Sequence, residues 1–260
     1  MLLKQLIKRI PVIGRMAHRV YAQFTGTWRL DPALWIPKLL PDETGTAVQI
    51  GSNDGKTGDP LYHFLKRNKK WRAVFVEPVP YLFERLKKNY SGDHRFGFEN
   101  AVIADDSQVH FYWVSQEAKS ALPGLPSWFD QLAGLSREHI CNQIPELEPF
   151  IQSTPFPGMS LTTLFHKHGL ERVDLLHIDT EGQDYKILRM LDLERFNPRV
   201  ILYERKHLSL GEEESSVRFL QPKYELYKLG DDILALNRLF INDTINSCLK
   251  PLSDLRIHDR

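Results

Sequence analysis

The order of apolar and polar positions along the chain predicts strands that alternate with helices. Short apolar runs with the length of buried strands occupy residues 46–50, 73–77, 96–103, 173–179 and 199–204. Apolar residues at helical spacing lie between these runs, over residues 59–68, 81–89, 161–168 and 184–191. This alternation predicts an α/β fold with a doubly wound, mainly parallel sheet.

The C-terminal part of the pattern departs from this alternation. Two strand-like runs, 224–229 and 233–237, are separated only by residues 230–232, which predicts a C-terminal antiparallel hairpin. We therefore place the main domain at residues 42–241 and treat residues 242–260 as a C-terminal tail. A further alternating run at 109–114 predicts an added strand inside the domain.

Residues 115–159 interrupt the regular pattern. The segment is rich in proline and also carries the aromatic residues Trp128 and Phe129. Irregular segments of this length inside a compact domain are usually functional or disordered, and the aromatic residues argue against simple disorder. We predict an insertion that covers the substrate. A purely structural excursion is the alternative.

The first 24 residues carry basic side chains and no acidic one, and apolar residues recur among them at helical spacing. We predict an amphipathic helix, kinked at Pro11, within an N-terminal helical extension that spans residues 1–41. One interpretation is a helix that lies peripherally on an anionic membrane surface. The other, which we favour, is a helix that packs on the domain or on a second subunit of a homo-oligomer.

Composition narrows the class of protein. The chain has 260 residues, 42% of them hydrophobic and 26% charged, as in ordinary globular proteins. A net charge of +1 does not favour nucleic acid as a partner. The chain has two cysteines and no cleavable signal pattern, which predicts a reduced, cytoplasmic protein. No apolar run approaches about 18 residues, so we expect no transmembrane helix.

A glycine-rich turn follows the first predicted strand. It contains Gly51, Asn53, Asp54 and Gly55, and a turn of this kind between a strand and a helix suits a nucleotide-type cofactor. The second predicted strand ends in Glu77, where such folds hold ribose hydroxyls. These residues therefore predict a cofactor site.

Asp54 favours one class of cofactor. A dinucleotide would place its pyrophosphate on this turn, where a carboxylate repels it. S-adenosylmethionine carries no phosphate and has two positive groups, so an acidic turn tolerates it. An Asp54 that only caps the following helix is the alternative interpretation.

Three short segments are the most distinctive in the chain: V-Q-I-G-S-N-D-G at 48–55, V-E-P at 76–78 and V-D-L-L-H-I-D-T-E-G at 173–182. In this order they resemble the FkbM family of S-adenosylmethionine-dependent O-methyltransferases, over most of the chain. The resemblance implies a seven-stranded Rossmann-like sheet, with the adenine beside Asn100 and Ala101. It also implies a hydroxyl of a sugar, glycan or related small molecule as the methyl acceptor. Gln49 stands where many members carry an acid, so this position supplies no charge to the cofactor's ammonium.

Polar residues gather after the fourth and fifth predicted strands. Methyl transfer to a weakly acidic hydroxyl is helped by a general base, and the candidates are Asp179, Glu181 and His207. Asp179 is also expected to contact the cofactor. A divalent cation, Mg²⁺ or Mn²⁺, bound by such side chains is the alternative way to acidify the hydroxyl. The local spacing assigns no metal ligands.

Two other classes of function stay open. A nicotinamide-dependent oxidoreductase would use the same strand–turn–helix unit, but Asp54 and the missing G-x-G-x-x-G pattern argue against it. A non-catalytic, membrane-peripheral scaffold with a methyltransferase fold is consistent with Gln49 and with the basic segment 1–24.

Overall fold

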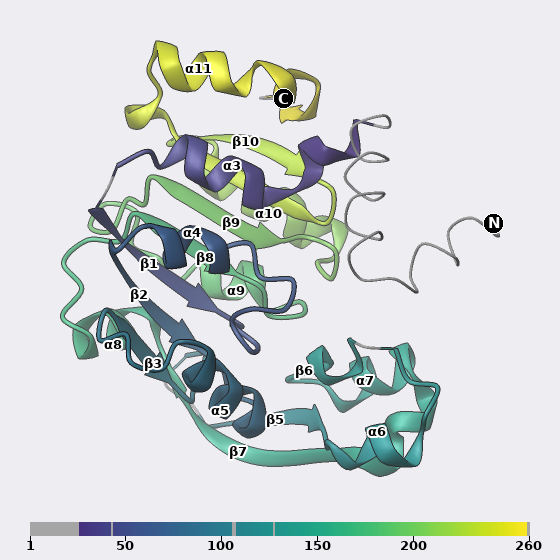
Figure 1. The fold of residues 1–260 in the computed structure, drawn as a ribbon. Helices are drawn as coiled ribbons and strands as arrows, with labels where there is room; N and C mark the ends of the chain where they lie inside the picture. Colours follow the sequence, from purple (N-terminus) through teal and green to yellow (C-terminus); the bar gives the residue numbers. More distant parts are fainter. Residues whose placement is uncertain (1–25, 43, 106–107, 127, 259–260) are drawn as a thin grey trace, which may run out of the picture.

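The structure is a computed structural model that describes residues 26–42, 44–105, 108–126 and 128–258. Among these residues, eight strands form one mixed sheet in the order β12-β10-β11-β9-β8-β1-β2-β3 (Figure 1). They are β1 (Thr44–Ile50), β2 (Lys70–Val76), β3 (Phe96–Glu99), β8 (Leu175–Ile178), β9 (Val200–Glu204), β10 (Tyr224–Leu229), β11 (Asp232–Asn237) and β12 (Arg256–Ile257). The sheet has one strand more than the seven predicted, because the tail adds β12 to the edge of β10.

Strands β1 and β8 lie side by side at the point where the order of the strands reverses. β1 pairs in parallel with both β2 and β8, and the chain continues outwards through β3 on one side and β9 on the other. β11 pairs antiparallel with β9 and with β10. Ligands of open α/β sheets bind outside the carboxyl ends of the strands at such a switch point. The fold therefore predicts a ligand site at the carboxyl ends of β1 and β8.

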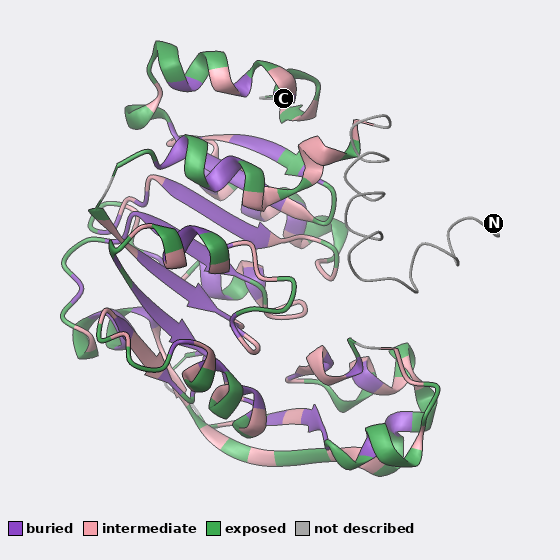
Figure 2. Ribbon diagram, in the orientation of Figure 1, coloured by how far each residue is buried: buried purple, intermediate pink, exposed green. Residues whose placement is uncertain are grey.

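Helices cover both faces of the main sheet, as expected for a doubly wound α/β fold. One face packs against α3 (Pro32–Leu39), α4 (Tyr62–Arg67), α5 (Pro80–Asn89) and α11 (Asp243–Leu249). The other face packs against α8 (Leu161–Lys167), α9 (Asp184–Leu188) and α10 (Leu210–Leu220). Figure 2 shows the central strands buried between these two layers.

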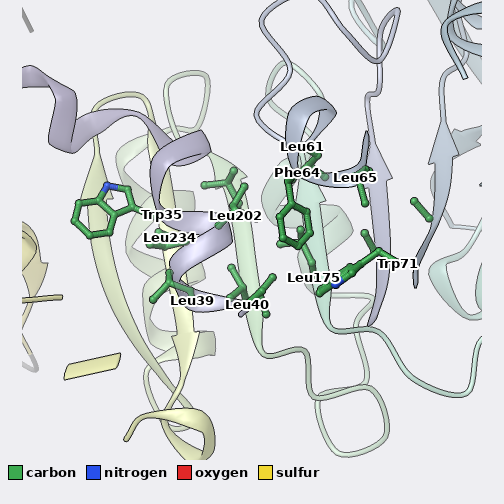
Figure 3. Close-up of a cluster of buried hydrophobic side chains, with 14 of the residues drawn as sticks. Trp35, Leu39, Leu40, Leu61, Phe64, Leu65, Trp71, Leu175, Leu202 and Leu234 are labelled. Carbon is green, nitrogen blue, oxygen red and sulfur yellow. The ribbon is translucent and has the colours of Figure 1, made fainter. Parts of the chain in front are cut away.

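Helix α3 belongs to the core of the domain. Asp31 caps its first turn, and Trp35, Leu39 and Leu40 are buried against the sheet. Figure 3 shows these side chains facing Leu202 and the neighbouring strands. The predicted boundary at residue 41 therefore does not divide the packing. Residues 1–25, which include the predicted amphipathic helix at 1–24, lie outside the described residues.

A second, smaller sheet branches from the third predicted strand. The run predicted as one strand at 96–103 is divided into β3, in the main sheet, and β4 (Val102–Ile103), in the second. The break falls at Asn100, whose Nδ2 donates to the carbonyls of Glu77 at 2.8 Å and Pro78 at 2.9 Å. Within the described part of the chain, the second sheet has the order β4-β7-β5-β6, with β5 (Gln108–Val114), β6 (Ala133–Gly134) and β7 (Ile151–Met159).

The predicted insertion, 115–159, is more regular than its sequence indicates. It contains α6 (Glu117–Ala121), α7 (Arg137–Gln143) and the 3-10 helices η2 (Phe129–Gln131) and η3 (Pro145–Phe150), which enclose a small core of their own. Its last nine residues form β7, which pairs antiparallel with β5. Pro155 and Pro157 concealed this strand in the sequence, because proline is confined to strand edges.

The remaining elements close the two ends of the described chain. The 3-10 helix η1 (Thr27–Leu30) precedes α3, and η4 (Arg238–Phe240) and η5 (Lys250–Leu255) flank α11. The segment treated as a tail therefore holds α11, η5 and β12. In the part of the chain that the structure describes, no helix has the length and apolar character needed to cross a membrane.

Candidate functional site

A cavity of about 260 Å³ lies at the carboxyl ends of β1, β2 and β8. The insertion supplies one of its walls, through Gln131 and residues 133–135. In Figure 1 this part of the insertion, with β6 and α7, lies beyond the arrowheads of β1 and β2. The predicted site residues that line the cavity are Gly51, Asn53, Glu77, Ala101, Asp179 and Glu181. The others, Asp54, Gly55, Asn100 and His207, lie outside its lining.

The ionisable side chains of the cavity wall are carboxylates and one histidine. They are Asp59, Glu77, Asp179, Glu181 and His177. Among the described residues that line the cavity there is no lysine or arginine. Such a wall favours a cationic ligand and disfavours a pyrophosphate, because like charges repel strongly where water is scarce.

Gly51 brings the ends of β1 and β8 into direct backbone contact. It has a φ of 77°, and a Cβ at this position would overlap the backbone carbonyl oxygen of Asp179. Its backbone N–H donates to the carbonyl of Val76 at 3.0 Å, which ties the same turn to β2. Only glycine allows the three strand ends to approach so closely.

Glu77 is fixed at the end of β2 by the turn after β1. Its Oε2 accepts from the backbone N–H of Asn53 at 2.7 Å, and its Oε1 accepts from that of Val79 at 2.8 Å. Each oxygen keeps a second lone pair for a ligand hydroxyl. Burial raises the pKa of Glu77 to about 7, and the nearby charge of Asp179 adds to this shift.

The remaining turn residues and Asn100 support the turn without lining the cavity. Asp54 accepts from the backbone N–H groups of Lys56 and Thr57, so it caps this turn and not helix α4. Gly55 packs against α5, where a Cβ would overlap the side chain of Leu86. Asn100 holds the backbone that follows β2 through the two hydrogen bonds described above.

A hydrogen-bonded pair of polar side chains in the cavity lining was not predicted. The Nε2 of Gln49 donates to Oδ2 of Asp59 at 3.1 Å, and Asp59 also caps α4 by accepting from Leu61 and Tyr62. Burial raises the pKa of Asp59 to about 6. One feature of the sequence points to this residue: Gln49 supplies no negative charge, and Asp59 is an acid ten positions later.

His177 lies next to Gln49 on the adjacent strand. The two residues are register partners between β1 and β8, and both line the cavity. Burial lowers the pKa of His177 to about 4, so its imidazole is neutral at physiological pH. Within the described structure, Nδ1 of His177 and Oε1 of Gln49 have no hydrogen-bond partner. These two atoms are available to a polar ligand.

The loop after β8 is held in shape by Asp184. Its Oδ2 accepts from the hydroxyl of Thr180 at 2.9 Å and from the backbone N–H of Gly182 at 3.3 Å. Its Oδ1 accepts from the backbone N–H of Glu204 at 3.3 Å, which joins the loop to the end of β9. Glu181 has a φ of 54°, and this loop turns it into the cavity.

Two histidines from different elements meet at Glu181. Nε2 of His207, which follows β9, lies 3.0 Å from Oε2 of Glu181, and Nε2 of His139, in α7, lies 3.6 Å from the same oxygen. Burial is the first cause that lowers the pKa of both histidines, that of His207 to about 4. Both are therefore neutral at pH 7, and these contacts are not ion pairs. No spacing pattern in the sequence pointed to His139.

The carboxyls at this end of the sheet hold their protons more tightly than usual. Desolvation raises the pKa of Glu181 to about 7 and that of Glu204 to about 9, and the charge of Asp179 contributes to both shifts. Asp179 is accessible through the cavity, but desolvation by the surrounding protein raises its pKa to about 6. At neutral pH the cavity therefore combines ionised and protonated carboxyls, as acid–base chemistry requires.

Comparison with known proteins identifies the domain. Residues 49–237 match the model of the methyltransferase FkbM domain. No curated protein matches the chain.

Similar solved structures share only low sequence identity with the chain. Precorrin-6y C5,15-methyltransferase from Geobacter metallireducens GS-15 is 12% identical, with 79% of this chain and 85% of that one covered and a TM-score of 0.39. The Methanococcus jannaschii fibrillarin pre-rRNA processing protein is 9% identical, with 75% and 66% covered and a TM-score of 0.39. A human methyltransferase 10 domain containing protein is 11% identical, with 80% and 81% covered and a TM-score of 0.40. Similarities this distant carry no argument about the reaction or the substrate.

Proposed function

The chain belongs to the FkbM methyltransferase family, and from this premise we propose that it transfers the methyl group of S-adenosylmethionine to a hydroxyl of a sugar, a glycan or a related small molecule. The observation that carries the proposal is the composition of the cavity wall, with four carboxylates and neither lysine nor arginine among its described residues. S-adenosylmethionine presents an ammonium and a sulfonium to such a wall. A dinucleotide would present two phosphates.

The residues of the cavity suit the parts of this cofactor. Glu77 has a free lone pair on each oxygen for the two ribose hydroxyls. Ala101, at the break between β3 and β4, lies where the adenine is expected. Asp59 supplies a negative charge beside Gln49, and we assign to it the contact with the ammonium that an acid at 49 would otherwise make. The methyl group then faces the loop after β8.

The reaction needs a hydroxyl oxygen in line with the sulfonium methyl. The oxygen–carbon bond forms as the sulfur–carbon bond breaks, and the sulfonium leaves as a neutral thioether. Glu181 lines the cavity, so it either takes the hydroxyl proton directly or binds a cation that acidifies the hydroxyl. Asp179 orients the cofactor or the acceptor.

Calorimetric titration of the protein with S-adenosylmethionine and, separately, with NADH tests the choice of cofactor. We expect binding of S-adenosylmethionine and no binding of NADH. Binding of NADH alone would replace the proposal with an oxidoreductase. Binding of neither ligand would favour the non-catalytic scaffold.

Substitution Glu181→Gln tests the role of Glu181 in the transfer. It is nearly isosteric and removes the charge, so we expect the transfer rate to fall by about 10²–10⁴-fold. The affinity for S-adenosylmethionine should stay within a few-fold, as calorimetry would show. Full turnover of the variant on a verified acceptor would disprove the assignment and make His207 or Glu204 the next candidate.

A further inference from the structure

The side chains of His139, Glu181 and His207 form a compact cluster. The three residues come from three separate elements, which are the insertion helix α7, the loop after β8 and the segment after β9. One donor atom from each lies within 4.8 Å of the other two. Nε2 of each imidazole lies near the same oxygen of Glu181, at 3.0 and 3.6 Å.

These imidazole nitrogens are not satisfied by other groups. Within the described part of the chain, Nε2 of His139 and Nε2 of His207 are buried without a hydrogen-bond partner. A buried polar atom without a partner costs about 1–3 kcal/mol, so such atoms usually mark a ligand, a water or an ion. Two such nitrogen atoms beside one carboxylate oxygen indicate a ligand, a water or an ion between the three side chains.

We propose that His139, Glu181 and His207 bind one divalent first-row transition-metal ion. Metal–nitrogen and metal–oxygen bonds of about 2.0–2.2 Å place neighbouring ligand atoms about 3.0–3.5 Å apart. The two histidine–carboxylate distances are 3.0 and 3.6 Å, at and just above this spacing, and one ligand atom of each residue lies within 4.8 Å of those of the other two. Two imidazoles and one carboxylate with open positions form a ligand set typical of zinc, iron and related ions.

The ion would join the insertion to the main domain. His139 lies on α7, whereas Glu181 and His207 follow strands of the main sheet. Among the three proposed ligands, Glu181 also lines the cavity, so the ion would lie beside the space expected for the acceptor. This consequence rests on the proposed function: with an open coordination position, the ion would lower the pKa of the acceptor hydroxyl, whose proton would pass to water as the oxygen attacks the sulfonium methyl. The transfer is otherwise unchanged.

The exposed side chain of Lys206 is the alternative source of positive charge for Glu181 and the two histidines. Its charge acts on Glu181 and on both histidines. Its ammonium has three N–H donors, and the same lone pairs of Glu181 and of the two neutral imidazoles that would bind a metal ion can accept from it. Titration with a metal ion therefore distinguishes the two cations.

Metal binding can be measured without cofactor or acceptor. The full chain, stripped with EDTA, is titrated with Co²⁺ and with Zn²⁺ by calorimetry, and Co²⁺ is also followed by absorption spectroscopy. We expect one ion per chain, with visible absorption of Co²⁺ bound to nitrogen and oxygen and no thiolate charge-transfer band. Such a band would assign the ion to Cys141 or Cys248 and overturn the proposal.

Two histidine substitutions form a matched pair. His139→Ala should weaken binding of Co²⁺ by at least about tenfold, whereas His166→Ala, at an exposed position of α8, should leave it unchanged. Equal affinity in the two variants, or no binding to the wild-type protein, would overturn the proposal. If His139→Ala does not fold, His139→Gln retains the size of the side chain and replaces it in the same comparison.

Hydrogen exchange separates this proposal from the proposed function. In the wild-type protein, addition of Zn²⁺ should slow exchange of the backbone amides of α7, and in His139→Ala it should not. Exchange that does not respond to the ion would show that the insertion is not joined to the domain in this way. Binding of S-adenosylmethionine in EDTA tests the methyltransferase site independently, so either idea can fail alone.

Discussion

The carboxylate of Asp59 and the amide of Gln49 share one hydrogen bond in the lining of the cavity. If Asp59 provides the charge for the ammonium, Asp59→Asn should weaken binding of S-adenosylmethionine by tenfold or more, because a charge-assisted bond contributes about 1.5–3 kcal/mol. The double variant Asp59→Asn with Gln49→Glu reverses the hydrogen bond and keeps one negative charge. It should recover most of the affinity in calorimetry.

This test has a matched control variant and an outcome that would disprove the role of Asp59. Asp243→Asn makes the same chemical change at an exposed position of α11 and should leave the affinity unchanged. If Asp59→Asn binds S-adenosylmethionine as tightly as the wild type, or if the double variant recovers nothing, Asp59 does not contact the ammonium.

Glu77 offers a second test at the scale of single residues. Its side chain accepts from two backbone N–H groups and is expected to accept from two ribose hydroxyls. Glu77→Ala should weaken binding of S-adenosylmethionine by tenfold or more, at about 1.4 kcal/mol per decade. Calorimetry measures this loss, and a circular dichroism spectrum confirms that the fold is intact. Unchanged affinity in a folded variant would remove Glu77 from the cofactor site.

Among the elements, helix α3 ties the N-terminal part of the described chain to the sheet. Trp35 is 0% exposed, and its Nε1 donates to the carbonyl of Arg29 at 2.9 Å. Trp35→Ala should lower the free energy of unfolding by about 3–5 kcal/mol, because it leaves a large cavity in the core. Trp128→Ala, at a side chain that is 44% exposed, should change it by less than about 1 kcal/mol. Urea unfolding of both variants measures the difference, and a loss of less than about 1 kcal/mol in Trp35→Ala would contradict a structural role of α3 in the core.

The elements also show what the sequence could and could not predict. The strands that border the cavity were predictable, because β1, β2 and β8 are short apolar runs that end in polar residues and glycine. The division of 96–103 was not, because it depends on hydrogen bonds from the side chain of Asn100 to residues more than 20 positions earlier. The sequence of helix α7 shows no such pattern, so the position of His139 beside Glu181 follows only from the folded structure.

At the scale of the whole molecule, buried carboxyls link stability to pH. Burial raises the pKa values of Glu77, Glu181, Asp184 and Asp232 to about 7. Above pH 7 the unfolded chain has already lost these protons, while the folded protein still holds part of them. Unfolding therefore releases protons, and a rise in pH favours the unfolded state. His177 and His207, whose pKa values are lowered to about 4, are neutral in the folded protein, and the small charge that they keep in the unfolded chain near pH 7 opposes this trend only weakly.

The ligand-free protein should accordingly lose stability between pH 7 and pH 9. We expect a loss of at least about 1 kcal/mol, which lowers Tm by about 2–4 °C in a protein of this size. Differential scanning fluorimetry at constant ionic strength measures the trend. A Tm that rises or stays constant over this interval would show that the carboxyls are ionised in the folded protein at neutral pH.

The antiparallel pairing of β5 with β7 has a consequence for how such proteins diverge. Val114 and Ile151 are register partners, so the chain leaves for the insertion and returns from it at adjacent positions. Recombination at these two points can exchange the enclosed segment as a cassette while the ends of the host stay in place. That cassette contains the wall at residues 133–135 and His139, whereas Asp59 and Glu77 stay in the host. On the proposed function, a new acceptor preference could therefore be inherited separately from the residues assigned to the cofactor.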